Sequence, residues 1–274
     1  LMINSARICG YNNAFDIEFS TIFEYLHAAT LLHDDVVDEA EKRRGKKAAH
    51  KKWSAPKVVL TGDFLLARAL DIAARTKEPD IISVIAKITR DMSEGEIDQL
   101  EKKGNLDLSE KEYLKIIERK TAVLLQGACK SGAILANAPK GQQDALNLYG
   151  FHLGMAFQMA DDLLDYTASA KELGKNPGAD MREGKLTLPL IYSLANASQK
   201  DRKWMEAAIT EPQFDSEQFE KLKKKLYIYK GIEYTKEKAG DHVDKAKACL
   251  AEFNDCPSKQ ILCLIADYSI ERKV

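Results

Sequence analysis

The sequence is poor in cysteine, in long uncharged runs and in net charge. Its five cysteines are an odd number without a CxxC pair, which disfavours a disulfide framework and a cysteine metal site. No run reaches the roughly 20 apolar residues that span a bilayer, and the start lacks the pattern of a signal peptide. Because 41 Lys and Arg balance 42 Asp and Glu, no global basic field exists to hold nucleic acid. We expect a cytoplasmic protein that binds anions through local clusters only.

Strand patterns of period two are also nearly absent, whereas apolar residues recur at spacings of three and four. Breaks rich in Pro, Gly and Asn separate the helical segments. Four segments are long enough to cross a whole domain at about 1.5 Å per residue. These segments are 16–41, 79–103, 108–136 and 141–168. We predict an all-α fold, a bundle of long helices that forms a single domain over residues 1–274.

Two segments 127 residues apart share an apolar-DDxxD pattern, Leu31–Asp38 and Gln158–Asp165. In a helix, the first and last aspartates of each motif project from one face, and the middle one is turned by about 100°. A single copy is readily explained as a solvated helix face. Two copies in apolar text are costly without a cation, and clustered carboxylates suit Mg²⁺, which keeps positions for water and phosphate. We therefore predict two Mg²⁺-binding segments.

Basic residues accompany both acidic motifs. Arg43 and Arg44 follow Asp38 closely, Lys175 and Lys185 follow the second motif, and Lys120 opens the apolar half of another helix. Each alone is more often a solvated surface charge. Together they surround two acidic sites with cations, as expected where a metal–diphosphate is bound from both sides.

These motifs resemble those of the trans-isoprenyl diphosphate synthases, the polyprenyl synthetase family, over nearly the whole chain. The matching text is Glu24–His27, LLHDDVVDEAEKRRG at 31–45, GDFLLARAL at 62–70, EGEIDQL at 94–100, KTAVL at 120–124, GMAFQMADDLLDY at 154–166 and GKNPGADMREGKLTLPLI at 174–191. The resemblance implies an isoprenoid synthase-type bundle of long antiparallel helices around a central cavity. It further implies a homodimeric enzyme that adds isopentenyl diphosphate to an allylic diphosphate.

The resemblance also implies roles for individual residues. It gives Asp34, Asp38 and Asp161 as ligands of three Mg²⁺ ions, with Asp165 as a further ligand. The other residues expected to act in catalysis are Asp35, Asp162, Lys120 and Lys175. The residues expected to bind the substrates are His27, Arg43, Arg44, Gln99, Thr121, Gln158 and Lys185. Of these, His27 and Arg44 match residues that hold the diphosphate of isopentenyl diphosphate.

Product length is expected to depend on the helix turns before Asp34. The residues concerned are Tyr25, Leu26, Ala29 and Thr30. Relatives that stop at C15 commonly have aromatic residues where Ala29 and Thr30 stand, so the text looks most like that of the octaprenyl, solanesyl and decaprenyl diphosphate synthases. Tyr25 either closes the bottom of the product cavity one helix turn deeper than Ala29 and Thr30, or packs between helices. Both interpretations stay open.

The Gly-Gly-Lys-Arg-x-Arg-Pro motif of the family is missing, because the chain begins about where that motif should end. We expect these 274 residues to lack an N-terminal helix and that motif, as a truncated sequence would. The alternatives are a geranylgeranyl (C20) diphosphate synthase and a non-catalytic regulatory subunit. A terpene cyclase is disfavoured, because the second motif is a full DDLLD followed by GKxxG.

Small residues form a stripe at helical spacing in the segment 127–136. They are Gly127, Ala128, Gly132, Ala133 and Ala136. Such a stripe suits close contact between helices, either across a dimer interface or within the core of one subunit. The sequence leaves both interpretations open.

Overall fold

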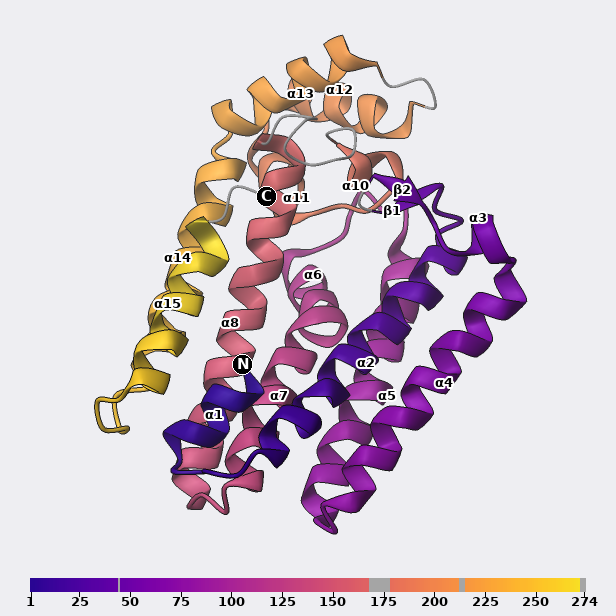
Figure 1. Cartoon of the computed structure of the whole chain (residues 1–274). Helices are drawn as coiled ribbons and strands as arrows, with labels where there is room; N and C mark the ends of the chain where they lie inside the picture. The colour runs from indigo at the N-terminus through magenta and orange to yellow at the C-terminus, as the bar shows by residue number, and fades with distance from the viewer. Residues whose placement is uncertain (44, 168–177, 212–214, 272–274) are drawn as a thin grey trace. The chain divides into compact units, whose positions relative to one another are not determined.

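The computed structural model describes residues 1–43, 45–167, 178–211 and 215–271, and these are mainly helical (Figure 1). The strands β1 (Lys42–Arg43) and β2 (Lys46–Lys47) pair antiparallel. The helices are α1 (Met2–Ile8), α2 (Phe15–Val37), α3 (His50–Trp53), α4 (Ala55–Arg75), α5 (Pro79–Lys102), α6 (Glu110–Ile117), η1 (Glu118–Ala122), α7 (Val123–Leu135), α8 (Lys140–Thr167), α10 (Ala179–Arg182), α11 (Leu188–Asn196), α12 (Gln199–Thr210), α13 (Ser216–Ile228), α14 (Gly231–Ala248) and α15 (Pro257–Glu271). The all-α prediction is confirmed.

The chain forms two compact units, each assembled from three stretches of sequence. The first comprises residues 1–90, 124–150 and 249–263, and the second comprises residues 91–123, 151–248 and 264–274. The expectation that residues 1–274 act as a single domain stays a prediction. The first unit contains the first acidic motif and the second unit contains the second.

In the first unit, α2 and α4 lie side by side and run in opposite directions (Figure 1). The buried face of α2 carries Phe19, Ile22 and Leu26. Gly62 on α4 lets the two helices approach, because a Cβ atom there would come within 2.2 Å of the His33 ring. The close contact fixes the end of α2 that carries the first acidic motif.

The small-residue stripe packs inside the first unit. A Cβ atom on Gly127 would lie 2.2 Å from Cδ1 of Ile88, and one on Gly132 would lie 2.6 Å from the carbonyl oxygen of Met2. Ala128 and Ala133 are buried. Of the two interpretations left open by the sequence, the core contact within one subunit is therefore the correct one.

The second unit has a core of apolar side chains from α6, α8, α11, α13 and α14. Helix α6 begins at a capping box, in which the Ser109 hydroxyl accepts from the Glu112 N–H at 3.3 Å and the Glu112 carboxylate accepts from the Ser109 N–H at 3.0 Å. This pairing satisfies two N–H groups that the helix end would leave unbonded.

Two of the four long predicted helices, 79–103 and 141–168, match α5 and α8 to within a residue. Helix α2 ends at Val37 rather than at residue 41, because Glu39 adopts a left-handed φ of 52° and the chain turns into β1. The single α-helix predicted over 108–136 is wrong, since the π-helical turn η1 separates α6 from α7.

Candidate functional site

The first acidic motif lies at the carboxyl end of α2, in the first unit. Asp34 and Asp38 are half-buried, whereas Asp35 is only 4% exposed. This difference agrees with the predicted arrangement, in which Asp35 is turned away from the face shared by the other two. The backbone N–H of Asp38 donates to the Asp34 carbonyl at 2.8 Å, so both residues belong to one helix end.

Arg43, which was predicted to contact a diphosphate, binds Asp35 in this structure. Its Nε and Nη2 atoms donate to Oδ1 of Asp35 at 2.9 and 2.6 Å. The Arg43 side chain keeps 42% of its surface exposed, so it can still reach an anion at the end of α2. Arg44 lies outside the described residues, and His27 is exposed on α2.

The second acidic motif lies on α8, in the second unit, and its three aspartates have different surroundings. Asp161 is half-buried, whereas Asp162 and Asp165 are buried. The Asp165 carboxylate accepts the backbone N–H groups of Ala179 and Asp180, both at 3.2 Å. Asp165 therefore ties α8 to the start of α10.

A chain of hydrogen bonds joins three predicted site residues. The Thr121 hydroxyl donates to Oε1 of Gln158 at 2.7 Å, and Nε2 of Gln158 donates to Oδ1 of Asp162 at 2.8 Å. The other oxygen of Asp162 accepts from the Tyr113 hydroxyl at 2.6 Å. Sequence reasoning missed Tyr113, whose only signal is its position two helix turns before Lys120.

The surroundings of Asp162 disfavour its negative charge. Burial raises the pKa of Asp162 to about 8, and the Asp180 carboxylate adds to this rise, while the hydrogen bonds from Tyr113 and Gln158 oppose it. Burial likewise raises the pKa of Tyr113 well above its ordinary value. A cation close to this part of α8 would relieve the cost of the charge.

Lys120 stands in the π-helical turn η1, which lies against α5. A Cβ atom on Gly95 would come within 2.6 Å of the Lys120 backbone nitrogen, so only glycine fits here without a shift. The Lys120 ammonium donates to Oε1 of Gln99 at 2.7 Å and forms an ion pair with Glu96. The structure thus brings together Lys120 and Gln99, which the sequence had indicated separately, and adds Glu96. Turns of this kind often occur at functional sites.

Lys185 follows a tight turn at Gly184, whose φ is 75°. The Gly184 carbonyl accepts from the N–H of Gly104 at 2.8 Å, which holds the turn against the end of α5. The Lys185 side chain is 13% exposed and its ammonium lies 2.9 Å from a Glu183 oxygen. Lys175 lies outside the described residues.

The residues expected to limit product length occupy the middle of α2. Leu26 and Ala29 are buried, and Tyr25 and Thr30 are half-buried. The Thr30 hydroxyl donates to the His27 carbonyl at 3.0 Å. Because Ala29 is buried, a larger side chain at this position has to displace its neighbours.

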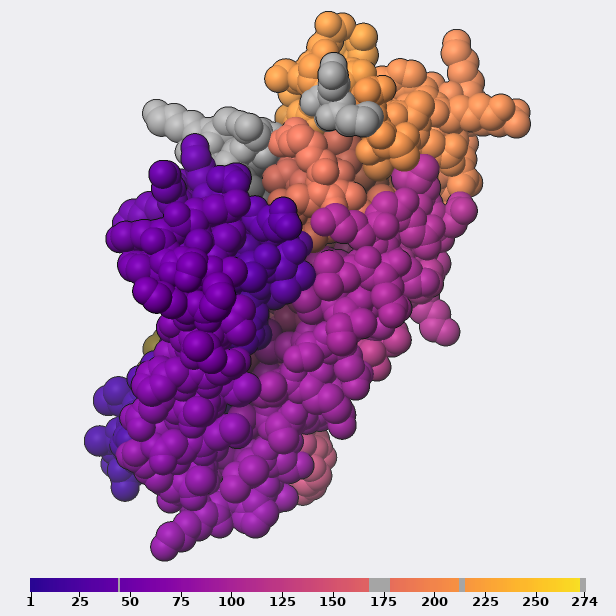
Figure 2. Space-filling view, turned by 90° about the vertical axis from the view of Figure 1, so that its right-hand side faces the viewer, coloured from indigo at the N-terminus to yellow at the C-terminus, as the bar shows by residue number. Residues whose placement is uncertain are grey.

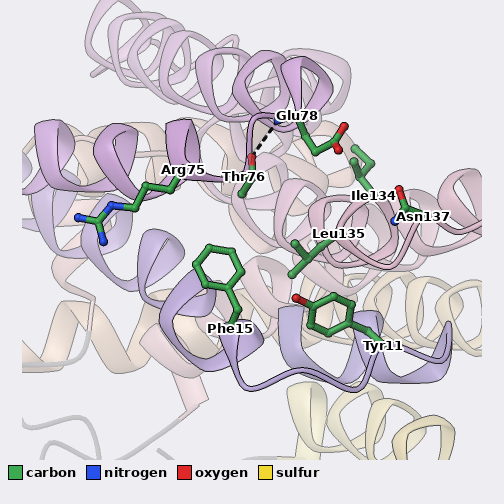
Figure 3. A pocket seen from close by; sticks show the side chains of 8 residues that line it. All are labelled: Tyr11, Phe15, Arg75, Thr76, Glu78, Ile134, Leu135 and Asn137. Atoms are coloured by element: carbon green, nitrogen blue, oxygen red, sulfur yellow. Dashed lines mark hydrogen bonds between the residues drawn. The ribbon is translucent and has the colours of Figure 1, made fainter.

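A pocket of about 360 Å³ lies at the opposite end of α2 from Asp34. Figure 3 shows the rings of Phe15 and Tyr11 beside the side chain of Leu135. Arg75, Thr76, Glu78, Ile134 and Asn137 complete its lining. None of the predicted site residues lines this pocket.

The donor set of the two motifs suits a hard cation. Asp34, Asp38 and Asp161 offer half-buried carboxylate oxygens. Among the described residues, no group of three or more His, Cys, Asp or Glu side chains could hold a metal by itself. Each motif therefore needs oxygens from water or from a phosphate to complete the coordination shell of a metal, and Mg²⁺ commonly binds such oxygens.

Within the described part of the chain, none of the helices has both the length and the apolar character needed to cross a membrane.

The chain matches a known protein family over most of its length. The family model described as Polyprenyl synthetase matches residues 1–226. The octaprenyl diphosphate synthase of Haemophilus influenzae is 35% identical over 99% of this chain and 82% of its own length. A crystal structure of a polyprenyl synthase from Caulobacter crescentus, complexed with calcium and isoprenyl diphosphate, superposes with a TM-score of 0.94 at 38% identity, covering 100% of this chain and 83% of that one. A decaprenyl diphosphate synthase from Rhodobacter capsulatus gives 0.93 at 37% identity, covering 100% and 84%.

Proposed function

Because the chain belongs to the polyprenyl synthetase family of prenyltransferases, we propose that it condenses an allylic diphosphate with successive isopentenyl diphosphates. The product is a medium- or long-chain all-trans polyprenyl diphosphate, as the names of the octaprenyl and decaprenyl relatives suggest. The observation that carries this proposal is the hydrogen-bonded chain from Thr121 through Gln158 to Asp162, which joins the KTAVL text to the second acidic motif.

The carboxylates of both motifs are proposed to hold Mg²⁺, three ions in all, when substrate is bound. Asp34 and Asp38 would act from α2, and Asp161, with Asp165, from α8. Support comes from the oxygen-only donor set and from the calcium and isoprenyl diphosphate bound to the Caulobacter relative. Bound there, the ions would stabilise the negative charge that develops on the leaving pyrophosphate.

The remaining residues of the site bind and orient the two diphosphates. Lys120, Gln158 and Lys185 would contact the allylic diphosphate, together with Arg43 and Lys175. Before substrate arrives, Glu96 and Gln99 hold the Lys120 ammonium in place, so Lys120 needs little reorganisation to bind an anion. His27 and Arg44 would hold the diphosphate of isopentenyl diphosphate.

The proposed reaction begins with the departure of pyrophosphate from the allylic substrate. The allylic C–O bond breaks, pyrophosphate leaves with the electron pair, and an allylic carbocation remains. The double bond of isopentenyl diphosphate attacks that cation and forms the new C–C bond. The resulting cation loses a proton to the departing pyrophosphate, which restores a double bond and gives the next allylic diphosphate. Repetition lengthens the chain by five carbons at each step.

The direct test is elongation by the purified protein. Farnesyl diphosphate, labelled isopentenyl diphosphate and Mg²⁺ are incubated with it, and the extracted prenyl products are sized. We expect products of C30 to C50. Asp34→Asn and Asp161→Asn should each lower the rate by at least about 100-fold, since they remove a charge that acts on the transition state. Asp144→Asn is the matched control, because Asp144 lies on α8 in an exposed pair with Lys140.

Other outcomes distinguish the alternatives. A product that stops at C20 would contradict the long-chain assignment, and Tyr25→Ala should then lengthen it if Tyr25 forms the floor. Cyclised hydrocarbon would favour a terpene cyclase. No elongation by the chain alone, but elongation when a partner subunit is added, would favour a regulatory subunit.

We also propose that the protein forms a homodimer through α4. This helix exposes Val59, Leu60 and Phe64, with Leu60 67% and Phe64 62% exposed. Helix α4 contributes to the surface turned toward the viewer in Figure 2. A second copy of the chain, packed against this face, would remove these apolar side chains from water.

A further inference from the structure

Two histidines outside the acidic motifs face each other across two helices of the second unit. Nδ1 of His152 on α8 lies 3.0 Å from Nδ1 of His242 on α14. The ring centroids are 5.1 Å apart and the ring planes meet at 56°. This contact is a hydrogen bond, in which the tautomers of the two rings decide which nitrogen donates. The proposed reaction uses neither residue.

The separation of the rings is close to that in a tetrahedral two-histidine metal site. With Zn–N bonds of about 2.0–2.1 Å, tetrahedral geometry puts two ligand nitrogens about 3.3 Å apart and the ring centroids about 5.2 Å apart. The observed distances, 3.0 and 5.1 Å, differ from these by a few tenths of an ångström. Small ring rotations, and transfer of one ring proton from Nδ1 to Nε2, would point both lone pairs at one ion.

The surroundings keep both imidazoles in the neutral form that binds metals. Burial lowers the pKa of His152, and the charge of Lys245 adds to this. Burial and the neighbouring His152 lower the pKa of His242 to about 4. Phe151 packs edge-on against both rings, with centroid distances of 5.0 and 6.2 Å, and so limits their rotation.

The charged side chains around His152 and His242 affect how strongly a cation binds between the two rings. Lys245 and Lys238 oppose a cation near His242, and Asp241 favours one. Among the residues that the structure describes, no third His, Cys, Asp or Glu joins the pair in a metal-binding group, so water would complete the coordination. An open site with two protein ligands and nearby lysines binds reversibly.

We propose that His152 and His242 together bind one transition-metal ion, such as Zn²⁺ or Co²⁺, which ties α14 to α8. Imidazole prefers such ions to Mg²⁺, so this site is chemically distinct from the carboxylates of the acidic motifs. It does not depend on the proposed function, because it rests only on the geometry of these two side chains.

The test is a titration of the whole chain with Co²⁺ at pH 7 in excess Mg²⁺, which competes with Co²⁺ for carboxylate oxygens elsewhere on the chain. The visible absorption of Co²⁺ shows whether nitrogen atoms bind the ion. A rise in the Tm shows that the bound ion holds α14 against α8. We expect one equivalent of bound Co²⁺ and a rise in Tm. His152→Gln and His242→Gln should each weaken binding by at least about tenfold, since each removes one of two protein ligands. His50→Gln is the control, because His50 lies on α3 in the other unit.

A second variant tests the same site in the opposite direction. Lys245→Gln removes a positive charge that acts on both rings, so it should tighten Co²⁺ binding several-fold without adding a ligand. Binding of Co²⁺ that is unchanged in a folded His152→Gln, His242→Gln double variant would overturn the proposal. So would a Lys245→Gln variant that binds Co²⁺ no better than the parent protein.

Discussion

At the scale of single residues, Tyr113 and Asp162 form a buried contact in the second unit. Both side chains are buried, and their hydrogen bond of 2.6 Å supports a carboxyl group on the motif that is proposed to meet the substrate. We expect Tyr113→Phe to lower the free energy of unfolding by about 1–3 kcal/mol, because it leaves a buried acceptor with one donor fewer. Urea denaturation measures this loss.

The control for this substitution is Tyr227→Phe, which removes a hydroxyl from an exposed position. It should change the free energy of unfolding by less than about 0.5 kcal/mol. Equal effects of the two substitutions would show that the Tyr113 hydroxyl contributes nothing specific. Elongation rates of Tyr113→Phe should fall as well, since Asp162 would be held by Gln158 alone.

His242 makes the stability of the protein depend on pH. Its folded pKa of about 4 lies below the ordinary value of 6.5, so the folded state favours the neutral ring. The stabilisation is complete above pH 6.5 and is lost as the pH falls from 6.5 through 4. Between pH 7 and 5, allowing for partial exposure, the free energy of unfolding should fall by about 1 kcal/mol on this account.

The measurement is urea denaturation at pH 7, 6 and 5 in metal-free buffer, for the parent protein and for His242→Gln. The slope with pH should be smaller in the variant, because glutamine does not titrate. If the free energy of unfolding changed with pH equally in the parent and the variant, groups other than His242 would cause the pH dependence.

At the scale of elements, the π-helical turn η1 depends on a glycine of a neighbouring helix. A Cβ atom on Gly95 would meet the Lys120 backbone nitrogen at 2.6 Å and Cβ of Arg119 at 2.8 Å. Gly95→Ala should therefore destabilise the protein by about 1–3 kcal/mol, because overpacking outweighs the better helix propensity of alanine. Thermal or urea unfolding gives the difference.

Gly240 provides the matched control on α14, since a Cβ atom there meets nothing within 4 Å. Gly240→Ala should stabilise the protein by about 0.5–1 kcal/mol, as expected for an open helix position. The two substitutions are chemically identical and should have opposite signs. If Gly95→Ala instead stabilised the protein, η1 would be able to move away from the added methyl group without a loss of stability.

The same elements show how far the sequence predicts the structure. Apolar spacing and breaks at Pro and Gly place α5 and α8 to within a residue, because local propensity and burial agree there. The turn η1 was not predicted, and the tight contact that it makes with Gly95 joins residues distant in sequence. For the same reason the motifs indicated Lys120 and Asp162, but not Glu96 and Tyr113, which matter only through contacts distant in sequence. Whether the indicated residues act as proposed stays a prediction.

At the scale of the whole molecule, the apolar face of α4 predicts self-association. Replacing Leu60 and Phe64 with glutamate should shift the protein from dimer to monomer, because charges would have to be buried in the interface. Light scattering coupled to size-exclusion chromatography measures the mass. Ile228→Glu is the control, since Ile228 on α13 is as exposed as Leu60, at 67%. A parent protein that is monomeric at micromolar concentration would contradict the proposal.

The π-helical turn also constrains how the length of this chain can evolve. A π turn contains about one residue more than an α turn, and each residue of an α-helix advances the face by about 100°. Loss of one residue from 118–122 would rotate α6 relative to Thr121, so that Tyr113 and Thr121 could no longer both reach the Gln158–Asp162 pair on α8. Among relatives that keep both contacts, insertions and deletions should accumulate in the loop before α6 and spare these five positions.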